Sequence, residues 1–483
     1  MTNKAKNLSV DICVIGAGAG GLSVAAGASQ MGASVALVES GKMGGDCLNY
    51  GCVPSKAMLA AGHAAEAVRQ GGRFGVEADG PTVDAGRVYG HIGNVIKAIE
   101  PNDSIERFEG MGVTVIQGFG RFVGPKEIEV VAEGDADPTH ISARRFVIAT
   151  GSRPFVPPIP GLDGVDYHTN ETIFQGPILP DHLIVIGGGP IGIEMAQAHR
   201  HLGVRVTVLE MFSIMPKDDP ELVAVVRRRL DEDGIDIIEG AAITGVEKTG
   251  TGIAVSLKDG DIARTIEGSH LLVATGRRAN VDGVGLDAAG INASPQGIDV
   301  DARLRTSNKR VFAIGDVAGG LQFTHVAGYH AGVVIKNALF RWPAKADHRA
   351  VPWVTYTAPE LAQVGLTEAE AKREHGDIRV LRWPYHENDR AQAEADTDGM
   401  VKAVVTPKGR ILGCGIAGSH AGELIQTWVL AMSQNLKIGA VAQMIAPYPT
   451  LGEVSKRAAG SFYTPSIFSE RTRKIVGFLR RFG

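Results

Sequence analysis

The sequence is poor in cysteine, in net charge and in long apolar runs, and each shortage excludes a class of protein. Four cysteines among 483 residues are too few for a disulfide-built extracellular scaffold. No stretch reaches the roughly 18 apolar residues of a membrane span, and the polar first ten residues are unlike a signal peptide. A net charge of −4 argues against nucleic acid as the main partner. We therefore expect a cytoplasmic protein that binds no nucleic acid.

What the chain does contain fits a large globular protein. Its length suggests roughly three domains, and 44% hydrophobic with 21% charged residues is typical of soluble proteins. The 63 glycines gather at junctions between expected strands and helices rather than in repeats. Glycine-rich turns are therefore the first place to look for ligand binding.

The first such turn follows an apolar run at 10–15 that predicts a buried parallel strand. A helix is expected over 22–31 and a second strand over 35–38. The turn and its closing acid supply a dinucleotide-binding fingerprint formed by Gly16, Gly18, Gly21 and Glu39. Glycines let the backbone approach a pyrophosphate, and the acid accepts hydrogen bonds from a ribose.

A second fingerprint follows the expected strand at 183–186. It consists of Gly187, Gly189, Gly192 and Glu210, with a helix expected over 193–201 and a strand over 204–209. An acid in this place favours a free ribose 2′-hydroxyl, whereas a 2′-phosphate usually needs an arginine nearby. The nearest following base is Lys217, so we expect NADH rather than NADPH.

Both units end alike, which indicates an internal duplication. A strand at 145–149 runs into Thr150 and Gly151, and a strand at 271–273 runs into Ala-Thr-Gly ending at Gly276. A further strand is expected over 306–316, and Asp316 at its end would point into the ligand crevice of a doubly wound sheet. Within the first unit, before its last strand, we expect helices over 56–69 and 84–109 and strands over 113–122 and 127–131.

The segment 44–56 carries Cys47 and Cys52, five residues apart. On an ideal helix that spacing is about 140° of rotation, so the thiols would point apart. Bonding them needs a distorted turn, which Gly51 and Pro54 permit. A disulfide between them would close a small loop and restrain little of the unfolded chain, which favours a redox role over a stabilising one. The second interpretation of this pair is zinc binding, but zinc usually needs another pair of ligands. The third is that they are two unrelated cysteines of the core.

From residue 352 the pattern changes to a separate α+β domain. Strands are expected over 354–357, 378–382, 399–405 and 411–416, and helices over 421–433 and 440–445. The tail over 469–483 mixes five basic residues with apolar ones. A solvated terminal helix is favoured there over a membrane-surface role.

The order of these motifs resembles the FAD-dependent pyridine nucleotide–disulfide oxidoreductases of the lipoamide dehydrogenase, glutathione reductase and mercuric reductase group. The motif GGDCLNYGCVPSK is the most specific part of the resemblance, which covers nearly the whole chain. It implies that FAD binds at the first fingerprint and NAD(P)H at the second. Cys52 would lie against the flavin, Cys47 would exchange with substrate, and Lys56 would lie near the flavin with Glu194 as its partner.

The resemblance also implies the fold class and the remaining cofactor contacts. We expect an α/β protein with two Rossmann-like domains and a C-terminal α+β dimerisation domain, which forms a homodimer. The expected segments are 1–155 for FAD, 156–281 for NAD(P), 282–350 as a central FAD-binding segment and 351–483 for dimerisation. Further FAD contacts are expected from Gly45, Gly120, Thr150, Gly151 and Asp316.

One departure from the family concerns the catalytic base. Thiol–disulfide members of the family carry a histidine five residues before a glutamate, where this chain has Tyr448 before Glu453. A phenol with a pKa of ~10 is a poor base at neutral pH. Tyrosine here is similar to the mercuric reductases, but no cysteine follows Cys414 to deliver a metal.

The expected function is therefore transfer of electrons from NAD(P)H through FAD to a Cys47–Cys52 disulfide. The acceptor beyond it, a small-molecule or protein disulfide or another oxidant, is not named by the sequence. Dihydrolipoamide dehydrogenase, a mercuric or metal-ion reductase and a non-catalytic redox subunit are the alternatives. The resemblance implies no resident metal.

Overall fold

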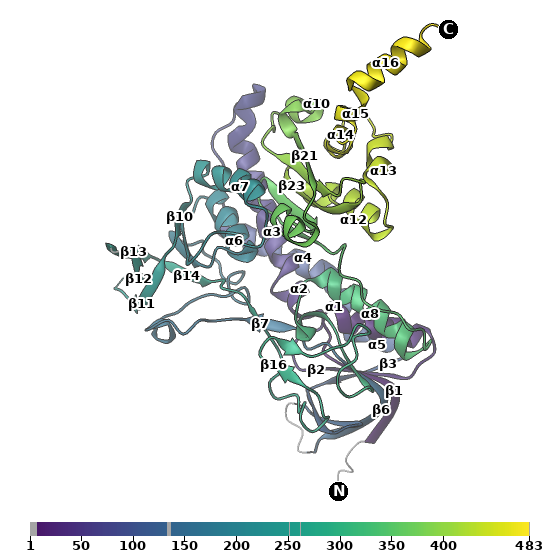
Figure 1. Cartoon of the computed structure of the whole chain (residues 1–483). Coiled ribbons are helices and arrows are strands. Elements are labelled where there is room, and N and C mark those ends of the chain that lie inside the picture. Colours follow the sequence, from purple (N-terminus) through teal and green to yellow (C-terminus); the bar gives the residue numbers. More distant parts are fainter. Residues whose placement is uncertain (1–6, 133–136, 251, 261, 483) are drawn as a thin grey trace.

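The computed structural model describes residues 7–132, 137–250, 252–260 and 262–482, and three sheets organise them (Figure 1). The first sheet has the strand order β3-β2-β1-β6-β5-β4, and β18 also pairs with β6. Its strands are β1 (Asn7–Ile15), β2 (Val35–Glu39), β3 (Val113–Gln117), β4 (Phe119–Gly124), β5 (Glu127–Val131), β6 (Thr139–Ile148) and β18 (Val311–Ala313). The parallel part, β3-β2-β1-β6-β18, is the doubly wound core that the apolar runs predict.

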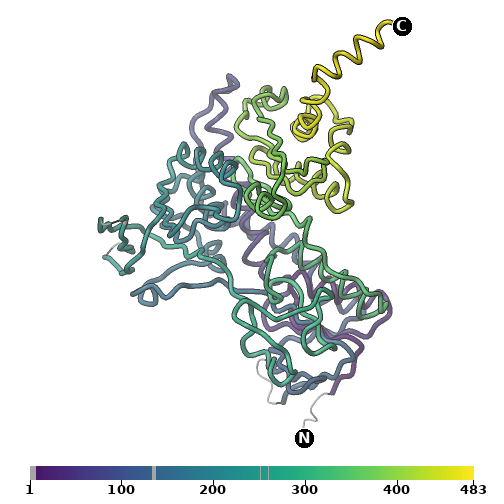
Figure 2. Tube along the Cα trace, viewed as in Figure 1, coloured from purple at the N-terminus to yellow at the C-terminus, as the bar shows by residue number. Residues whose placement is uncertain are grey.

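Helices from both ends of the first 340 residues cover this sheet. The helices in this part of the chain are α1 (Ala19–Gln30), α2 (Gly45–Asn49), α3 (Cys52–Gln70), α4 (Ala85–Ile99), α5 (Ile105–Gly110) and α8 (Thr324–Ala338). Of these, α1, α5 and α8 pack against the sheet, whereas α3 and α4 pack against the second unit. Helices α1 and α8 pack together over one apolar cluster, although some 300 residues separate them. Figure 2 shows the green trace of α8 lying beside the purple N-terminal segment.

The second sheet is parallel, in the order β10-β9-β8-β14. Its elements are β8 (His182–Ile186), α6 (Pro190–His201), β9 (Arg205–Glu210), α7 (Pro220–Glu232), β10 (Asp236–Glu239) and β14 (His270–Val273). A three-stranded antiparallel sheet lies in the same part of the chain, built from β11 (Ala242–Lys248), β12 (Ile253–Asp259) and β13 (Ile262–Gly268). A short ribbon of β7 (Ser152–Pro154) and β15 (Arg277–Ala279) connects the first and second units, and β16 (Ala293–Ser294) pairs with β17 (Gly297–Ile298).

The third sheet is antiparallel, in the order β19-β20-β23-β22-β21. Its strands are β19 (Pro352–Thr355), β20 (Glu360–Gly365), β21 (Arg379–Pro384), β22 (Met400–Val405) and β23 (Ile411–Gly418). Its helices are α9 (Glu368–His375), α10 (Asp389–Ala393), α11 (Ala421–Leu424), α12 (Gln426–Ser433), α13 (Ile438–Gln443), α14 (Glu453–Ser461), α15 (Thr464–Ile467) and α16 (Glu470–Leu479). The expected fold class, two Rossmann-like units followed by an α+β domain, is confirmed.

Several expected elements are shorter or interrupted. The single helical region expected over 84–109 is broken by a 3₁₀ turn at Glu100–Asp103, where Pro101 cannot donate a backbone hydrogen bond. The strand expected over 113–122 divides at Gly118, and the helix over 421–433 divides at Ile425. The strand expected over 306–316 contracts to β18, because the preceding residues form turns.

A buried lysine joins the second unit to the third. The ammonium of Lys402, on β22, lies 2.8 Å from a carboxylate oxygen of each of Asp219 and Glu221 at the start of α7, and 2.8 Å from Glu368 on α9. The Lys402 side chain is only 5% exposed, and its ion pairs with these carboxylates offset the free-energy cost of removing the ammonium from water.

Among the described helices, we find none with the length and hydrophobicity to cross a bilayer.

Candidate active site

In the first glycine-rich turn, backbone segments approach each other so closely that a side chain on some of the glycines would clash with neighbouring backbone atoms. A Cβ built on Gly21 would lie 1.9 Å from the carbonyl oxygen of Gly16, and one built on Gly16 would lie 2.4 Å from that of Ala149. Gly18 has no atom within 4 Å of its Cβ position, and no side chain caps the α1 N-terminus. A Cβ at Gly18 would take up space in the adjoining cavity. The uncapped N–H groups are what a pyrophosphate requires.

The second turn repeats this geometry. A Cβ on Gly192 would lie 2.0 Å from the Gly187 oxygen, and one on Gly187 would lie 2.5 Å from the Ala274 oxygen. These values match the first turn to within about 0.1 Å, as the internal duplication predicts.

Each turn is closed by a glutamate that accepts two backbone hydrogen bonds. The Glu39 carboxylate accepts from the N–H of Ala17 at 2.5 Å and of Gly41 at 2.6 Å. The Glu210 carboxylate accepts from the N–H of Gly188 at 2.6 Å and of Phe212 at 2.9 Å. The two carboxylates are thus held at the same place relative to their glycines, at the carboxyl end of the second strand of each unit.

A cavity of about 1300 Å³ opens above the first turn. Among the residues expected to bind cofactor or act in catalysis, its lining includes Gly16, Gly18, Glu39, Gly45, Cys47, Cys52, Lys56, Gly120, Thr150, Gly151, Glu194 and Asp316. It borders the second turn only at Pro190 and Ile191, in the first turn of α6. The expected residues outside the lining are Gly21, Gly187, Gly189, Gly192, Glu210, Gly276, Tyr448 and Glu453.

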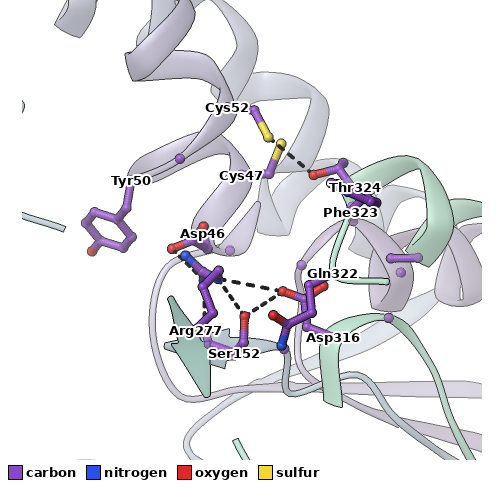
Figure 3. A pocket seen from close by; sticks show the side chains of 18 of the residues that line it. Asp46, Cys47, Tyr50, Cys52, Ser152, Arg277, Asp316, Gln322, Phe323 and Thr324 are labelled. Carbon is purple, nitrogen blue, oxygen red and sulfur yellow. Dashed lines mark hydrogen bonds and ion pairs between the residues drawn. The ribbon is translucent and has the colours of Figure 1, made fainter. Parts of the chain in front are cut away.

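The two cysteines meet at a break between helices. Cys47 belongs to α2, which ends at Asn49, and Cys52 is the first residue of α3. The break falls at Tyr50 and Gly51, as the five-residue spacing requires, whereas Pro54 lies inside the first turn of α3. The structure holds both cysteines as free thiols, and Figure 3 shows their sulfurs side by side.

The neighbours of the cysteine pair make the two thiols unequal. A hydrogen bond from Cys47 lowers the pKa of Cys52 to about 6; a hydrogen bond from Thr324 and the charge of Lys56 also lower it, against the effect of burial. The hydroxyl Oγ1 of Thr324 lies 3.3 Å from the Cys52 sulfur. The same hydrogen bond, seen from the other side, raises the pKa of Cys47. These contacts therefore favour the thiolate on Cys52 and the thiol on Cys47.

Lys56 is held one turn further along α3. Its ammonium lies 2.7 Å from Oε2 of Glu194, on α6, and 4.3 Å from the ring centroid of Tyr356. The other oxygen of Glu194 accepts from the Tyr356 N–H at 2.9 Å, so this buried carboxylate is fully engaged. The sequence-expected pair of Lys56 and Glu194 is thus brought together from helices of the first and second units.

A polar network connects the two halves of the cavity wall. Ser152 donates to the Asp316 carboxylate at 2.5 Å and accepts from Arg277 at 2.7 Å, and Arg277 also reaches Asp46 at 3.2 Å (Figure 3). Burial raises the pKa of Asp316. Ser152 and Arg277 were not among the expected site residues, although both directly follow an Ala-Thr-Gly ending, which is the signal that could have found them. Thr324 carries no such signal.

Tyr448 and Glu453 lie on the third unit, away from the cavity lining of their own chain. The Tyr448 hydroxyl donates to Oδ2 of Asp389 at 2.9 Å, and this hydrogen bond raises the pKa of the phenol. Tyr448 is therefore an even poorer base than an ordinary tyrosine. His420 borders a small cavity together with Thr450–Gly452. The fold thus brings this histidine close to the segment that contains Tyr448, although the two lie nearly thirty residues apart in the sequence.

Replacing Thr324 by valine is expected to raise the pH at which Cys52 ionises. Valine keeps the shape and removes the hydroxyl that bonds the thiolate, a bond of about 1 kcal/mol, which corresponds to a midpoint about 0.7 pH units higher. Peptide-resolved alkylation of Cys52 against pH in the reduced protein measures the midpoint. Thr324→Ser is the matched control and should keep the wild-type value near 6; an unchanged midpoint in Thr324→Val would contradict the assignment.

Comparison with known proteins agrees with this geometry. Residues 10–331 match the family described as pyridine nucleotide-disulphide oxidoreductase, and residues 351–459 match the dimerisation domain of that family. The chain is 36% identical to a mercuric reductase of Streptomyces lividans and 35% identical to a dihydrolipoyl dehydrogenase of Geobacillus stearothermophilus. Each alignment covers 94% of this chain and 96% of the relative.

Solved structures show the same relationship. LpdA from Mycobacterium tuberculosis superposes with a TM-score of 0.86 at 28% identity, over 94% of this chain and 99% of that one. The Cu(II) complex of the HOCl-induced flavoprotein disulfide reductase RclA from Escherichia coli superposes with a TM-score of 0.84 at 26% identity, with the same coverage. With the two fingerprints, the cysteine pair and the dimerisation domain all in family order, this chain belongs to the FAD- and pyridine nucleotide-dependent disulfide oxidoreductases.

Proposed function

We propose that the protein is an NADH-dependent flavoprotein reductase that delivers electrons through Cys47 and Cys52 to an oxidised acceptor. The observation that carries the proposal is the unequal cysteine pair, with one thiolate stabilised by Thr324 and Lys56, in the wall of a cavity that adjoins both nucleotide-binding turns. In this proposal the cofactor-binding and catalytic residues are those expected from the sequence, with Ser152, Arg277 and Thr324 added.

The residues around the first turn fit FAD. Gly16, Gly18 and Gly21 leave the α1 N-terminus open for the pyrophosphate, and Glu39 is positioned for the ribose. Asp316 would hold the chain between ribose and ring system. When bound, FAD supplies acceptance of a hydride from reduced nicotinamide and passage of its electron pair to a disulfide.

The cysteine pair then completes thiol–disulfide exchange. Two electrons and one proton convert the Cys47–Cys52 disulfide into a Cys47 thiol and a Cys52 thiolate. Cys47, once deprotonated, attacks one sulfur of a disulfide acceptor, forms a mixed disulfide and releases the other sulfur as a thiolate. Cys52 attacks the sulfur of Cys47, which restores the internal disulfide and releases the second thiolate.

The exchange requires removal of the proton from the Cys47 thiol before this sulfur can attack. Tyr448 is the residue that matches the family's base, and its phenol donates to Asp389 instead of accepting a proton. The segment lies outside the cavity of its own chain, and in the proposed homodimer it would act at the cavity of the partner, as the family resemblance implies. Acceptors that need little help with proton removal are therefore favoured over lipoamide.

A panel of acceptors tests the proposal. NADH oxidation by the purified FAD-loaded protein is measured with small disulfides, a protein disulfide, a quinone, Cu(II) and Hg(II). At least one acceptor should turn over faster in wild type than in Cys47→Ser. If none does, the dithiol route is wrong and the non-catalytic alternative gains support.

Discrimination between nicotinamide nucleotides follows from Glu210. Its carboxylate is held by two backbone N–H groups, where it can accept from a ribose 2′-hydroxyl and repel a 2′-phosphate. We expect kcat/KM for NADH to exceed that for NADPH by about tenfold or more, a difference of roughly 1.4 kcal/mol. Glu210→Gln keeps an acceptor and removes the charge, so the ratio should fall. Equal use of both nucleotides by the wild-type protein would overturn the preference.

A further inference from the structure

The C-terminal helix α16 stands clear of the rest of the molecule (Figure 1). It runs from Glu470 to Leu479, begins at an N-cap in which Ser469 accepts from the Thr472 N–H, and contains no buried residue. It lies beyond the matched dimerisation domain, which ends at residue 459. The helix thus lies outside the part of the chain that matches the family model.

One face of α16 is apolar and exposed. Ile475, Phe478 and Leu479 follow the i, i+3, i+4 spacing that places side chains on one side of a helix, and Phe482 follows just beyond the end of the helix. With Val476 beside them, these side chains are between 49% and 74% exposed. The rings of Phe478 and Phe482 are in contact, with centroids 5.1 Å apart. A helix that is simply solvated does not need such a face, and an exposed apolar patch of this kind marks an interaction site.

The other face of α16 is basic. Arg473 and Arg480 lie seven residues apart on it, as do Lys474 and Arg481, whereas Arg471 lies one turn before Ile475, at the N-terminal end of the apolar stripe. Glu470 is the single acid in the segment from 469 to 482. The surface that receives this helix must therefore accept both apolar side chains and several positive charges.

We propose that α16 docks the protein onto a bilayer surface that contains anionic phospholipids. Ten residues span about 15 Å, roughly half of the hydrocarbon thickness, so the helix is too short to cross and would lie in the plane of the headgroups. There the apolar face enters the acyl boundary while the arginines and lysine remain among the phosphates. The sequence had favoured a solvated helix, and the exposed aromatic face is what changes that interpretation.

A second copy of α16 is a less suitable partner. Packing two such helices through their apolar faces would leave the basic residues of both chains pointing outward with no opposite charge to meet them, whereas anionic headgroups would neutralise them. In a dimer, by contrast, two free helices on one assembly would bind the same membrane together and so increase its affinity.

Co-sedimentation with vesicles tests the proposal. The full-length FAD-loaded protein is mixed with vesicles of phosphatidylcholine alone, or of phosphatidylcholine with phosphatidylglycerol, across a salt series. We expect binding to the anionic vesicles that weakens as salt rises. Neutralising two basic residues in Arg480→Gln/Arg481→Gln should weaken binding about 25-fold at low salt, since each cation contributes about fivefold.

Two further variants separate the apolar contribution from a general effect of surface aromatics. Phe478→Ser/Leu479→Ser should weaken binding at least tenfold. Phe74→Ser removes an exposed phenylalanine elsewhere, 53% exposed beside the end of α3, and should bind as wild type does.

Three results would overturn the proposal. The first is wild-type protein that stays in solution with anionic vesicles at low salt. The second is equal binding to both vesicle types at every salt concentration. The third is a truncation after Ser469 that leaves vesicle binding unchanged, or that yields monomers by sedimentation because α16 belongs to the subunit interface.

Discussion

A Cys47→Ser variant is expected to lose acceptor reduction by about 10³-fold or more, because a hydroxyl cannot take part in sulfur exchange and nucleophile removal is among the largest single-residue effects in enzymes. FAD binding should persist, since Cys47 is a half-buried residue of a short helix whose packing serine preserves. NADH oxidation with the best acceptor of the panel measures the loss. Cofactor content, read from flavin absorbance, confirms that the protein is loaded.

The matched control is another cysteine. Cys414 lies fully buried on β23 in the core of the third sheet, and alanine there removes a thiol without touching the cavity wall. Cys414→Ala should therefore keep the wild-type rate, apart from some loss of stability from the small void. If both variants retain full activity, acceptors do not receive electrons from the cysteine pair.

The second large effect is expected at the proposed proton exit. Tyr448→His should raise lipoamide reduction by about 10²-fold from a low wild-type level, because a positioned general base contributes 10²–10⁴-fold. Asp389, which now accepts from the phenol at 2.9 Å, would accept from the imidazole and orient it. The activity gained should follow the ionisation of histidine, appearing as pH rises through a midpoint above the ordinary value of about 6.5, because the Asp389 carboxylate favours the imidazolium. Steady-state rates with lipoamide from pH 5 to 9 measure both features.

His420 provides the control for this prediction, because it lies beside Thr450–Gly452. His420→Asn should leave the low wild-type lipoamide rate unchanged. High lipoamide turnover in the wild-type protein that disappears in His420→Asn would show that His420 replaces the missing base. High turnover that survives His420→Asn would identify the protein as a dihydrolipoamide dehydrogenase with another proton acceptor.

The fold was readable from sequence where one pattern specified one element. Apolar runs followed by glycine turns and a closing glutamate predicted β1, α1, β2 and their counterparts β8, α6 and β9, with ends displaced by a few residues. Strand β13 was missed because it is mostly exposed and so lacks a buried apolar run. Strands β11 and β12 were missed as well, although β12 does bury an apolar run from Ile253 to Leu257. Interruptions such as Gly118 are local events that an averaged pattern does not resolve.

The site residues could be predicted where they belong to one sequence motif. They could not be predicted where the tertiary fold brings them together from distant parts of the chain. Cys47, Cys52 and Lys56 stand in one short segment, so spacing alone connects them. Thr324, in the first turn of α8, contacts Cys52 although 272 residues separate them. No motif around Thr324 in the sequence predicts that contact. The engagement of Tyr448 with Asp389 is equally invisible, since it depends on how α10 packs beside the segment before α14.

The buried ammonium of Lys402 limits how the enzyme can admit its substrates. Swinging the second unit away from the C-terminal domain would remove two of the three carboxylate partners of Lys402 and leave Asp219 without its cation, which costs several kcal/mol. Hinged closure of whole domains is therefore disfavoured in this molecule. Nicotinamide and acceptor should instead reach a chamber of nearly constant shape, and turnover should respond to side chains that line it, such as Ile191, rather than to solvent viscosity.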